Sequence, residues 1–209
     1  MNTLSKRLIA ITQRVDIIAD YGERRDALDQ QWIKLLAAMD ALPLLLPNHL
    51  RQAQSIVEKM KPDGFLLTGG NSLVNCGGNA PERDAMERML LERTLMTGTP
   101  LLGICRGMQV IQDYFGTPLQ RIKGHVTRKQ TIRIHEHRVE TNSFHDFGAY
   151  ETPQPLTAWA WADDHVIKAV RHKSAPIMGF MWHPERHTPF HQHDLERMHH
   201  FFANQGEST

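Results

Sequence analysis

The sequence predicts an α/β fold in which a central, mostly parallel sheet is flanked by helices. Two observations point to it. Short apolar runs alternate with amphipathic stretches through the first half of the chain, and two of those runs end in glycine-framed segments, LLTGG and LLGIC. Ligands of open parallel sheets bind beyond the carboxyl ends of the strands. Both glycine-framed segments are therefore expected to lie at the functional site.

The first half should contain a repeating β-α unit. Strands are expected over RLIAIT, LPLLLP, GFLLTGG and PLLGIC, at residues 7–12, 42–47, 64–70 and 100–105. Helices are expected over residues 22–41, 48–60, 81–98 and 106–116, from their apolar residues at three-and-four spacing. Pro81 is a typical helix start, and Gly98 and Gly116 are typical helix stops.

From about residue 117 the segments become shorter, which predicts a small antiparallel β element in the C-terminal half. Strands are expected over residues 130–135, 137–142, 156–162, 165–172 and 176–182, followed by a helix over 193–205. Trp159 and Trp161 alternate at strand spacing and should share one face of the sheet. No repeat or linker divides the chain, so one domain is expected over residues 1–209.

The composition narrows the classes of function. Lys and Arg number 24 against 23 Asp and Glu, with no basic block, so neither a nucleic-acid partner nor a membrane partner is expected. The ligand should be a small molecule. Two cysteines, Cys76 and Cys105, and an N-terminus without an export signal favour a cytoplasmic location with free thiols.

Cys105 lies between two glycines, at the junction of an apolar run and a helical pattern, in the segment Gly103-Ile104-Cys105-Arg106-Gly107. A strand, a tight turn and a helix in this order are typical of a nucleophile elbow, which exposes a reactive side chain. The helix N-terminus would also favour the thiolate. The alternative, a small core residue that happens to be flanked by glycines, stays open on this segment alone.

A thiolate nucleophile requires a base, and His183 in the segment MWHPERH is the best candidate. Pro184 should keep the backbone extended, so that the side chain of Glu185 reaches the imidazole two residues away. A Cys-His-Glu triad is then plausible. A solvated turn is the alternative for this segment.

Further histidines follow in the sequence. The set is His183, His187, His191 and His193. Their spacing is compatible with ligands on one helical face, but Pro184 and Pro189 interrupt any such helix. We therefore expect no metal site and no other cofactor.

Three segments taken together, TGG, GICRGMQ and HPE, resemble the class I glutamine amidotransferase superfamily, including its gamma-glutamyl hydrolase (peptidase C26) branch. The resemblance implies the flavodoxin-like fold of that family. It also implies that Cys105 is the nucleophile, His183 the general base and then acid, and Glu185 the group that orients His183. The backbone N–H groups of Gly70 and Arg106 would form the oxyanion hole.

The resemblance further implies a pocket for the glutamyl moiety. Its residues would be Gly69, Asn71, Gln109, Ser143, Phe144 and His145. Two side chains stay ambiguous. Arg83 could approach a diphosphate or cap the next helix together with Asp84, and the Arg106 side chain could contact the leaving group or pair with a surface carboxylate.

The substrate is implied only by similarity. Segments such as LLTGGNSL, GICRGMQVIQDYFG and NSFHDFG are most similar to hydrolases of gamma-glutamyl-CDP-amidate, which implies a nucleotide-linked gamma-glutamyl substrate. Three alternatives stay open: a gamma-glutamyl-aminobutyrate-type hydrolase, a glutaminase subunit that supplies ammonia to a separate synthase, and a non-catalytic member of the fold. The presence of Cys105, His183 and Glu185 argues against the last.

Overall fold

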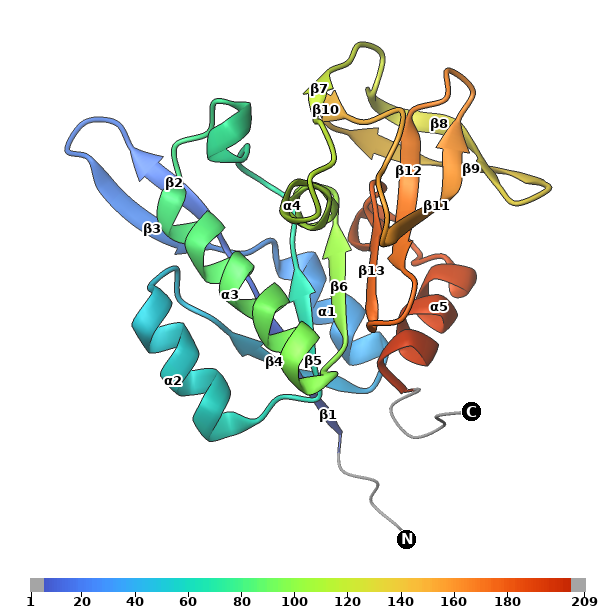
Figure 1. Ribbon diagram of the computed structural model, residues 1–209. Helices are drawn as coiled ribbons and strands as arrows, with labels where there is room; N and C mark the ends of the chain where they lie inside the picture. The colour runs from blue at the N-terminus through green and yellow to red at the C-terminus, as the bar shows by residue number, and fades with distance from the viewer. Residues whose placement is uncertain (1–5, 204–209) are drawn as a thin grey trace, which may run out of the picture.

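The computed structural model describes residues 6–203, and a nine-stranded sheet runs through it (Figure 1). The strand order is β4-β1-β5-β6-β13-β12-β11-β8-β9. These strands are β4 (Ala41–Leu45), β1 (Arg7–Ile11), β5 (Gly64–Leu67), β6 (Leu101–Ile104), β13 (Ile177–Phe180), β12 (Ile167–His172), β11 (Leu156–Ala162), β8 (Val126–Ile134) and β9 (His137–Phe144).

The sheet has a parallel half and an antiparallel half. Strands β4, β1, β5, β6 and β13 pair in parallel, and β12, β11, β8 and β9 continue from β13 as antiparallel neighbours. The predicted α/β fold is confirmed, and these antiparallel strands extend the central sheet itself. Two small antiparallel sheets accompany it, one of β7 (Gln120–Arg121) with β10 (Phe147–Gly148) and one of β2 (Arg14–Ile18) with β3 (Glu23–Ala27).

Helices cover both faces of the sheet (Figure 1). α1 (Gln30–Ala38) and α5 (Gln192–Ala203) contribute to one buried apolar cluster. α2 (Leu50–Met60), α3 (Pro81–Thr97) and α4 (Arg106–Tyr114) contribute to the other. No helix within residues 6–203 has the length and apolar character needed to cross a membrane.

The helix predicted over residues 22–41 is wrong in its first part. Glu23–Ala27 is strand β3, paired with β2 in a hairpin, and the helix begins only after Asp29, whose side chain accepts a hydrogen bond from the N–H of Gln31. Charged side chains of β3 make contacts with residues outside the hairpin. Arg24, for example, donates a hydrogen bond to Glu82. These tertiary contacts stabilise a strand that apolar periodicity cannot reveal.

Trp159 and Trp161 do not share a face as predicted. Trp159 belongs to the cluster that contains α1 and α5, whereas Trp161 packs against the other cluster. The register between β11 and β12 shifts twice between Ala158 and Trp161, and this irregularity changes the alternation of the side chains. The other predicted strands, and the helix at the C-terminal end up to residue 203, are present. Residues 204 and 205 of that predicted helix lie outside the described residues. The strand expected over residues 176–182 was placed in the antiparallel element, which is wrong for its pairing with β6: as β13 it runs parallel to that strand, and only its other neighbour, β12, is antiparallel.

Three neighbouring parallel strands end at the same edge of the sheet. β5 leads into Thr68-Gly69-Gly70, β6 leads into Cys105, and β13 leads towards His183. Because β5 pairs with β6 and β6 pairs with β13 in parallel, these three carboxyl ends are adjacent. The strand order therefore brings together the three segments that the sequence singled out.

Candidate active site

Cys105 lies in the sharp turn between β6 and α4. Its backbone has φ 53° and ψ −105°, a conformation that is rare for a residue with a side chain. A Cβ on Gly103 would lie 2.4 Å from the backbone of Gly107, and a Cβ on Gly107 would lie 2.3 Å from the carbonyl oxygen of Leu67. The two glycines are therefore required by the close approach of strand and helix, which forces the turn that carries the thiol.

His183 and Glu185 form a buried pair beyond the end of β13. His183 Nδ1 lies 2.7 Å from Glu185 Oε1, and the residues are 1% and 2% exposed. The contact is as predicted, although Pro184–Arg186 forms a short 3₁₀ turn and not an extended segment. Glu185 thus accepts the hydrogen bond that fixes the ring, which leaves Nε2 of His183 as the working nitrogen.

Asn142 is a site residue that the sequence reasoning missed. Its Oδ1 accepts from the backbone N–H of His183 at 2.8 Å, and its Nδ2 donates to the carbonyl of His183 at 2.8 Å. The Asn142 side chain is buried at the end of β9 and holds the backbone of the base from both sides. The signal for it in the sequence was its place at the start of NSFHDFG, a segment noted above for its similarity to the hydrolases.

The electrostatic surroundings of His183 favour its charged form. Burial lowers the pKa of the imidazole, but the negative charges of Cys105 and Glu185 outweigh burial and raise that pKa to about 9. Among residues 6–203, Nε2 of His183 makes no contact with hydrogen-bond geometry. At neutral pH this pKa keeps the imidazole of His183 protonated next to Cys105, which is one of the groups that raise it.

Cys105 and His183 line one cavity of about 310 Å³. A Cβ on Gly69 would lie 2.9 Å from His183 Cε1 and 3.7 Å from Cys105 Cβ, so the backbone of Gly69 lies close to both side chains. Phe144 packs edge-on against the His183 ring at 5.7 Å between centroids, and its carbonyl oxygen lies 3.8 Å from Cys105 Sγ. All three elements of the predicted triad are therefore brought together at one edge of the sheet.

Gly70, in the loop after β5, and Arg106, the first residue of α4, both line the cavity together with Cys105. Within the described part of the chain, neither backbone N–H donates to a backbone carbonyl. Two free N–H groups beside a nucleophile are what an oxyanion hole requires. Their predicted role stays a prediction, and their placement is compatible with it.

The predicted substrate residues divide into two groups. Asn71, Gln109, Phe144 and His145 line the cavity, whereas Gly69 lines a smaller neighbouring cavity beneath His183. Ser143 points away, because its hydroxyl donates to the carbonyl of His125 and accepts from Lys168. The Asn71 side chain is also engaged, with the backbone of Val15 on β2.

Lys168 is a second residue that the sequence reasoning missed, and it lies beneath the cavity wall. Its buried Nζ is 2.8 Å from His125 Nδ1, 3.0 Å from Ser143 Oγ and 2.7 Å from His145 Nε2. Burial lowers the pKa of Lys168 to about 7. Burial and the neighbouring Lys168 hold the pKa of His145 well below its ordinary value, so His145 is neutral, with Nδ1 donating to the carbonyl of Phe147 at 2.8 Å.

Arg83 neither approaches the cavity nor caps a helix, and both predictions for it are wrong. It is fully buried, and its guanidinium donates to the carbonyl oxygens of Thr68 at 2.8 Å, Gly69 at 3.1 Å and Gly70 at 2.6 Å. Its Nε donates to Glu87 at 2.9 Å. Arg83 therefore fixes the shape of the loop that follows β5.

The Arg106 side chain turns away from the cavity into the same network. It pairs with Glu87, which is fully buried, and with Asp84, whose side chain is 27% exposed, so the predicted pairing with a carboxylate near the surface is partly confirmed and the structure places the guanidinium away from a leaving group. Burial raises the pKa of Glu87, but Arg106 and Arg83 outweigh it and lower that pKa overall. The carboxylate of Glu87 thus joins the loop after β5 to the residue that follows the nucleophile.

Comparison with known proteins agrees with this geometry. The model of the family "Glutamine amidotransferase class-I" matches residues 25–202. A gamma-glutamyl-CDP-amidate hydrolase from Campylobacter jejuni is 32% identical, over 85% of this chain and 90% of that protein. A gamma-glutamyl-gamma-aminobutyrate hydrolase from Escherichia coli O157:H7 is 27% identical, over 78% of this chain and 80% of that protein.

The solved structures agree on the fold. A glutamine amidotransferase from Thermotoga maritima superposes with a TM-score of 0.64 at 14% identity, over 97% of this chain and 86% of that one. Together with the hydrolase relatives, the family supports an amidohydrolase enzyme that acts on gamma-glutamyl compounds. The chain belongs to the class I glutamine amidotransferase family.

Proposed function

We propose that this protein is a hydrolase that cleaves the gamma-glutamyl C–N bond of a small conjugate through a thioester on Cys105. One observation carries the proposal: Cys105, in its strained turn, and His183, held 2.7 Å from Glu185, line the same cavity of about 310 Å³. A nucleophile, a base and an orienting carboxylate in this relation are the components of acyl transfer.

In the first step the Cys105 sulfur attacks the gamma-carbonyl carbon, and the carbonyl oxygen becomes an oxyanion between the N–H groups of Gly70 and Arg106. Collapse of this intermediate breaks the C–N bond. The protonated His183, whose pKa is about 9, gives its Nε2 proton to the leaving nitrogen. The products of this step are the free amine or amidate and a glutamyl thioester.

In the second step the now neutral His183 takes a proton from water, and the resulting hydroxide attacks the thioester. Glutamate leaves and the thiolate and imidazolium pair is restored. Glu185 stabilises the charge on the ring in both steps, and Asn142 keeps the ring in place through the backbone of His183. The chain's own residues account for every proton transfer.

For the substrate we propose gamma-glutamyl-CDP-amidate, which would give glutamate and cytidine diphosphoramidate, in bacterial surface-polysaccharide modification. The support is the similarity to the hydrolase of that compound and the charge at the cavity. Arg186 lines both the main cavity and its smaller neighbour, with a side chain that is 41% exposed. A guanidinium in this position suits the diphosphate of a nucleotide-linked leaving group.

The test is glutamate release from glutamine, gamma-glutamyl-aminobutyrate and gamma-glutamyl-CDP-amidate, with Cys105→Ala as the control. We expect turnover of the nucleotide conjugate, its loss in Cys105→Ala, and little turnover of glutamine. Preferential turnover of the aminobutyrate conjugate would keep the chemistry and replace the leaving group. Turnover of glutamine only after addition of a synthase would instead identify a glutaminase subunit.

Replacement of Arg186 tests the nucleotide assignment separately. Arg186 also lies 3.7 Å from Glu185 Oε1 and over the Phe144 ring, so its loss can affect both conjugates. Arg186→Met should raise KM for gamma-glutamyl-CDP-amidate by roughly tenfold more than KM for the aminobutyrate conjugate, because only the first loses a charge-assisted contact. Arg138→Met is the matched control, since Arg138 is 67% exposed and pairs with Asp163. Equal effects of Arg186→Met on the KM values of the two conjugates would show that Arg186 does not contact the diphosphate.

A further inference from the structure

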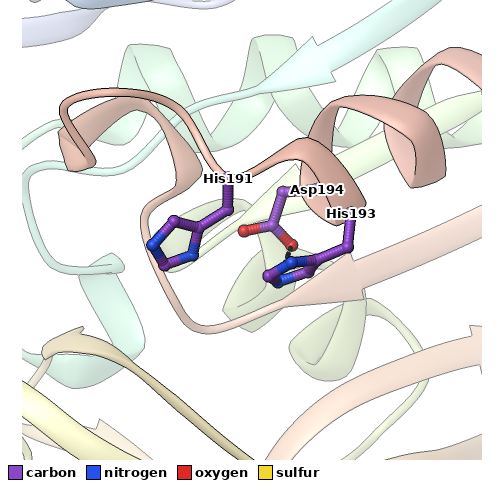
Figure 2. Close-up of side chains that lie close together, drawn as sticks. All are labelled: His191, His193 and Asp194. Carbon is purple, nitrogen blue, oxygen red and sulfur yellow. Dashed lines mark ion pairs between the residues drawn. The ribbon is translucent and has the colours of Figure 1, made fainter.

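The segment that follows the proposed base brings metal-ligating side chains together in a cluster that the proposed hydrolysis does not use. We propose that His191, His193 and Asp194 form a site for a divalent transition-metal ion of the zinc class. One ring nitrogen of each histidine and one carboxylate oxygen of Asp194 all lie within 4.8 Å of one another. Figure 2 shows the carboxylate between the two imidazole rings, where the first turn of α5 begins.

Two atoms of this cluster are buried without a partner. Asp194 is 2% exposed, and its Oδ2 has no hydrogen-bond partner in the range 6–203; the same holds for Nδ1 of His191. A buried polar atom left unpaired destabilises the folded chain, and native proteins rarely keep two such atoms in one cluster. A bound cation accepts an electron pair from both atoms and so removes both penalties.

The remaining oxygen of Asp194 is held as a metal-ligating carboxylate usually is. Oδ1 accepts from Trp182 Nε1 at 3.2 Å and from Arg197 Nη1 at 2.9 Å. Hydrogen bonds of this kind orient the carboxylate and leave its other oxygen for the metal. The positive charge of Arg197 repels a cation, so the affinity of the site for the metal depends on how strongly the two imidazoles bind it.

The histidines can adapt to a metal from two different supports. His191 is stacked against His187 at 3.7 Å between ring centroids, which fixes its orientation from the loop side. His193 has a side chain that is 50% exposed, and its Nε2 is 3.7 Å from Asp194 Oδ1 (Figure 2). A stacked imidazole, a buried carboxylate and a half-exposed imidazole with space to change its rotamer allow the distances to shorten to those of a tetrahedral site.

The donor set selects the class of metal. Two imidazoles and one carboxylate suit zinc, nickel and copper, whereas calcium and magnesium prefer oxygen ligands alone. From the sequence no metal was expected, because Pro184 and Pro189 interrupt a helix. The segment between the two prolines is indeed not part of α5. His191 nevertheless reaches the site from the loop before α5, and His193 and Asp194 reach it from the first turn of that helix.

The experiment uses the full-length protein with Cys105→Ala, so that the thiol cannot bind the probe metal. After chelation, Co²⁺ is titrated by absorption and Zn²⁺ by calorimetry. We expect one equivalent to bind, with a tetrahedral Co²⁺ spectrum, and the midpoint of thermal unfolding to rise. His193→Ala should weaken binding on the order of tenfold or more, because one ligand is lost.

His200→Ala is the matched control, since His200 is exposed on the same helix and lies outside the cluster. It should bind Co²⁺ and Zn²⁺ as the parent does. Binding that is equal in the parent, His193→Ala and His200→Ala would overturn the proposal, as would a failure of the parent to bind either metal at millimolar concentration. Neither result depends on catalytic activity, so the outcome is independent of the proposed function.

Discussion

Two buried polar networks support different parts of the same cavity, and they are built from different chemistry. Beneath Gly70 and the nucleophile turn, the side chains of Arg83 and Arg106 are paired with Glu87. Beneath the opposite part of the wall, Lys168 is surrounded by neutral acceptors, among them His145. The first network balances positive charge with negative charge, whereas the second leaves its ammonium without a carboxylate in contact.

This difference in charge balance predicts which of the two networks changes its protonation near neutral pH. Burial lowers the pKa of Arg83 only to about 10, so the arginine network keeps its charges across the neutral range. Burial lowers the pKa of Lys168 to about 7, where the charge is half lost. We infer that the arginine network holds the loop after β5 rigid, while the lysine network changes its charge near neutral pH beside the cavity.

The largest effect is expected when the balance of the arginine network is broken. Glu87→Gln leaves two buried guanidinium groups short of a negative charge, and the free energy of unfolding should fall by about 3–5 kcal/mol. Chemical denaturation measures it. Glu92→Gln on the same helix is the control: its pair with Arg88 is more than half exposed, and the loss should stay below about 1 kcal/mol. Similar losses in both variants would refute the comparison.

The lysine network should reveal itself in the pH dependence of stability. The native pKa of Lys168, about 7, lies below its ordinary 10.5, so the unfolded chain binds more protons between these values and stability rises across them. The native pKa of His183, about 9, lies above its ordinary 6.5, so its contribution is complete below pH 6.5 and is lost as the pH rises to 9.

Between pH 7 and 9 the two slopes oppose each other, and the wild-type free energy of unfolding should be nearly constant. Lys168→Met removes only the rising slope. Its stability should therefore fall through this window, by up to about 1.4 kcal/mol per pH unit. Denaturation series at fixed pH values measure the slope, with Lys173→Met, an exposed lysine, as the control. A wild-type profile that falls as steeply as that of Lys168→Met would show that Lys168 does not titrate there.

The smallest effect concerns Ser143, which the sequence assigned to the substrate and the structure assigns to the lysine network. Ser143→Ala removes one acceptor of Lys168 and should cost about 1 kcal/mol of stability. Because the hydroxyl does not line the cavity, KM should be unchanged. Steady-state kinetics and denaturation together test this, since a raised KM with unchanged stability would show that Ser143 contacts the substrate.

The parallel strands of the first half of the chain, and the positions of Cys105, His183 and Glu185 near one another, could be predicted from sequence because each rests on local pattern. Apolar runs that end in glycine predict β5 and β6. The two glycines that the tight turn requires, Gly103 and Gly107, are visible in the segment GICRG. The contact between His183 and Glu185 also depends on residues two apart in sequence. Contacts between residues that are close in the sequence can be predicted without a structure.

The supporting networks could not be predicted, because their partners lie far apart in the chain. Asn142 reaches His183 across 41 residues, and Lys168 reaches His125 across 43. An arginine in a polar segment, such as Arg83, has the same appearance in sequence whether it faces a ligand or is buried against carbonyls. The hairpin of β2 and β3 was missed for a similar reason, since Arg24 and Glu82 stabilise it over 58 residues.

The central claim is that Cys105 forms the covalent intermediate within this cavity, and one measurement tests it directly. The protein is mixed with gamma-glutamyl-CDP-amidate and with gamma-glutamyl-aminobutyrate, quenched in acid within a turnover, and examined by mass spectrometry of its peptides. We expect a glutamyl adduct on the peptide that contains Cys105, and neither adduct nor glutamate release in Cys105→Ala. Glutamate release that persists in Cys105→Ala would contradict it.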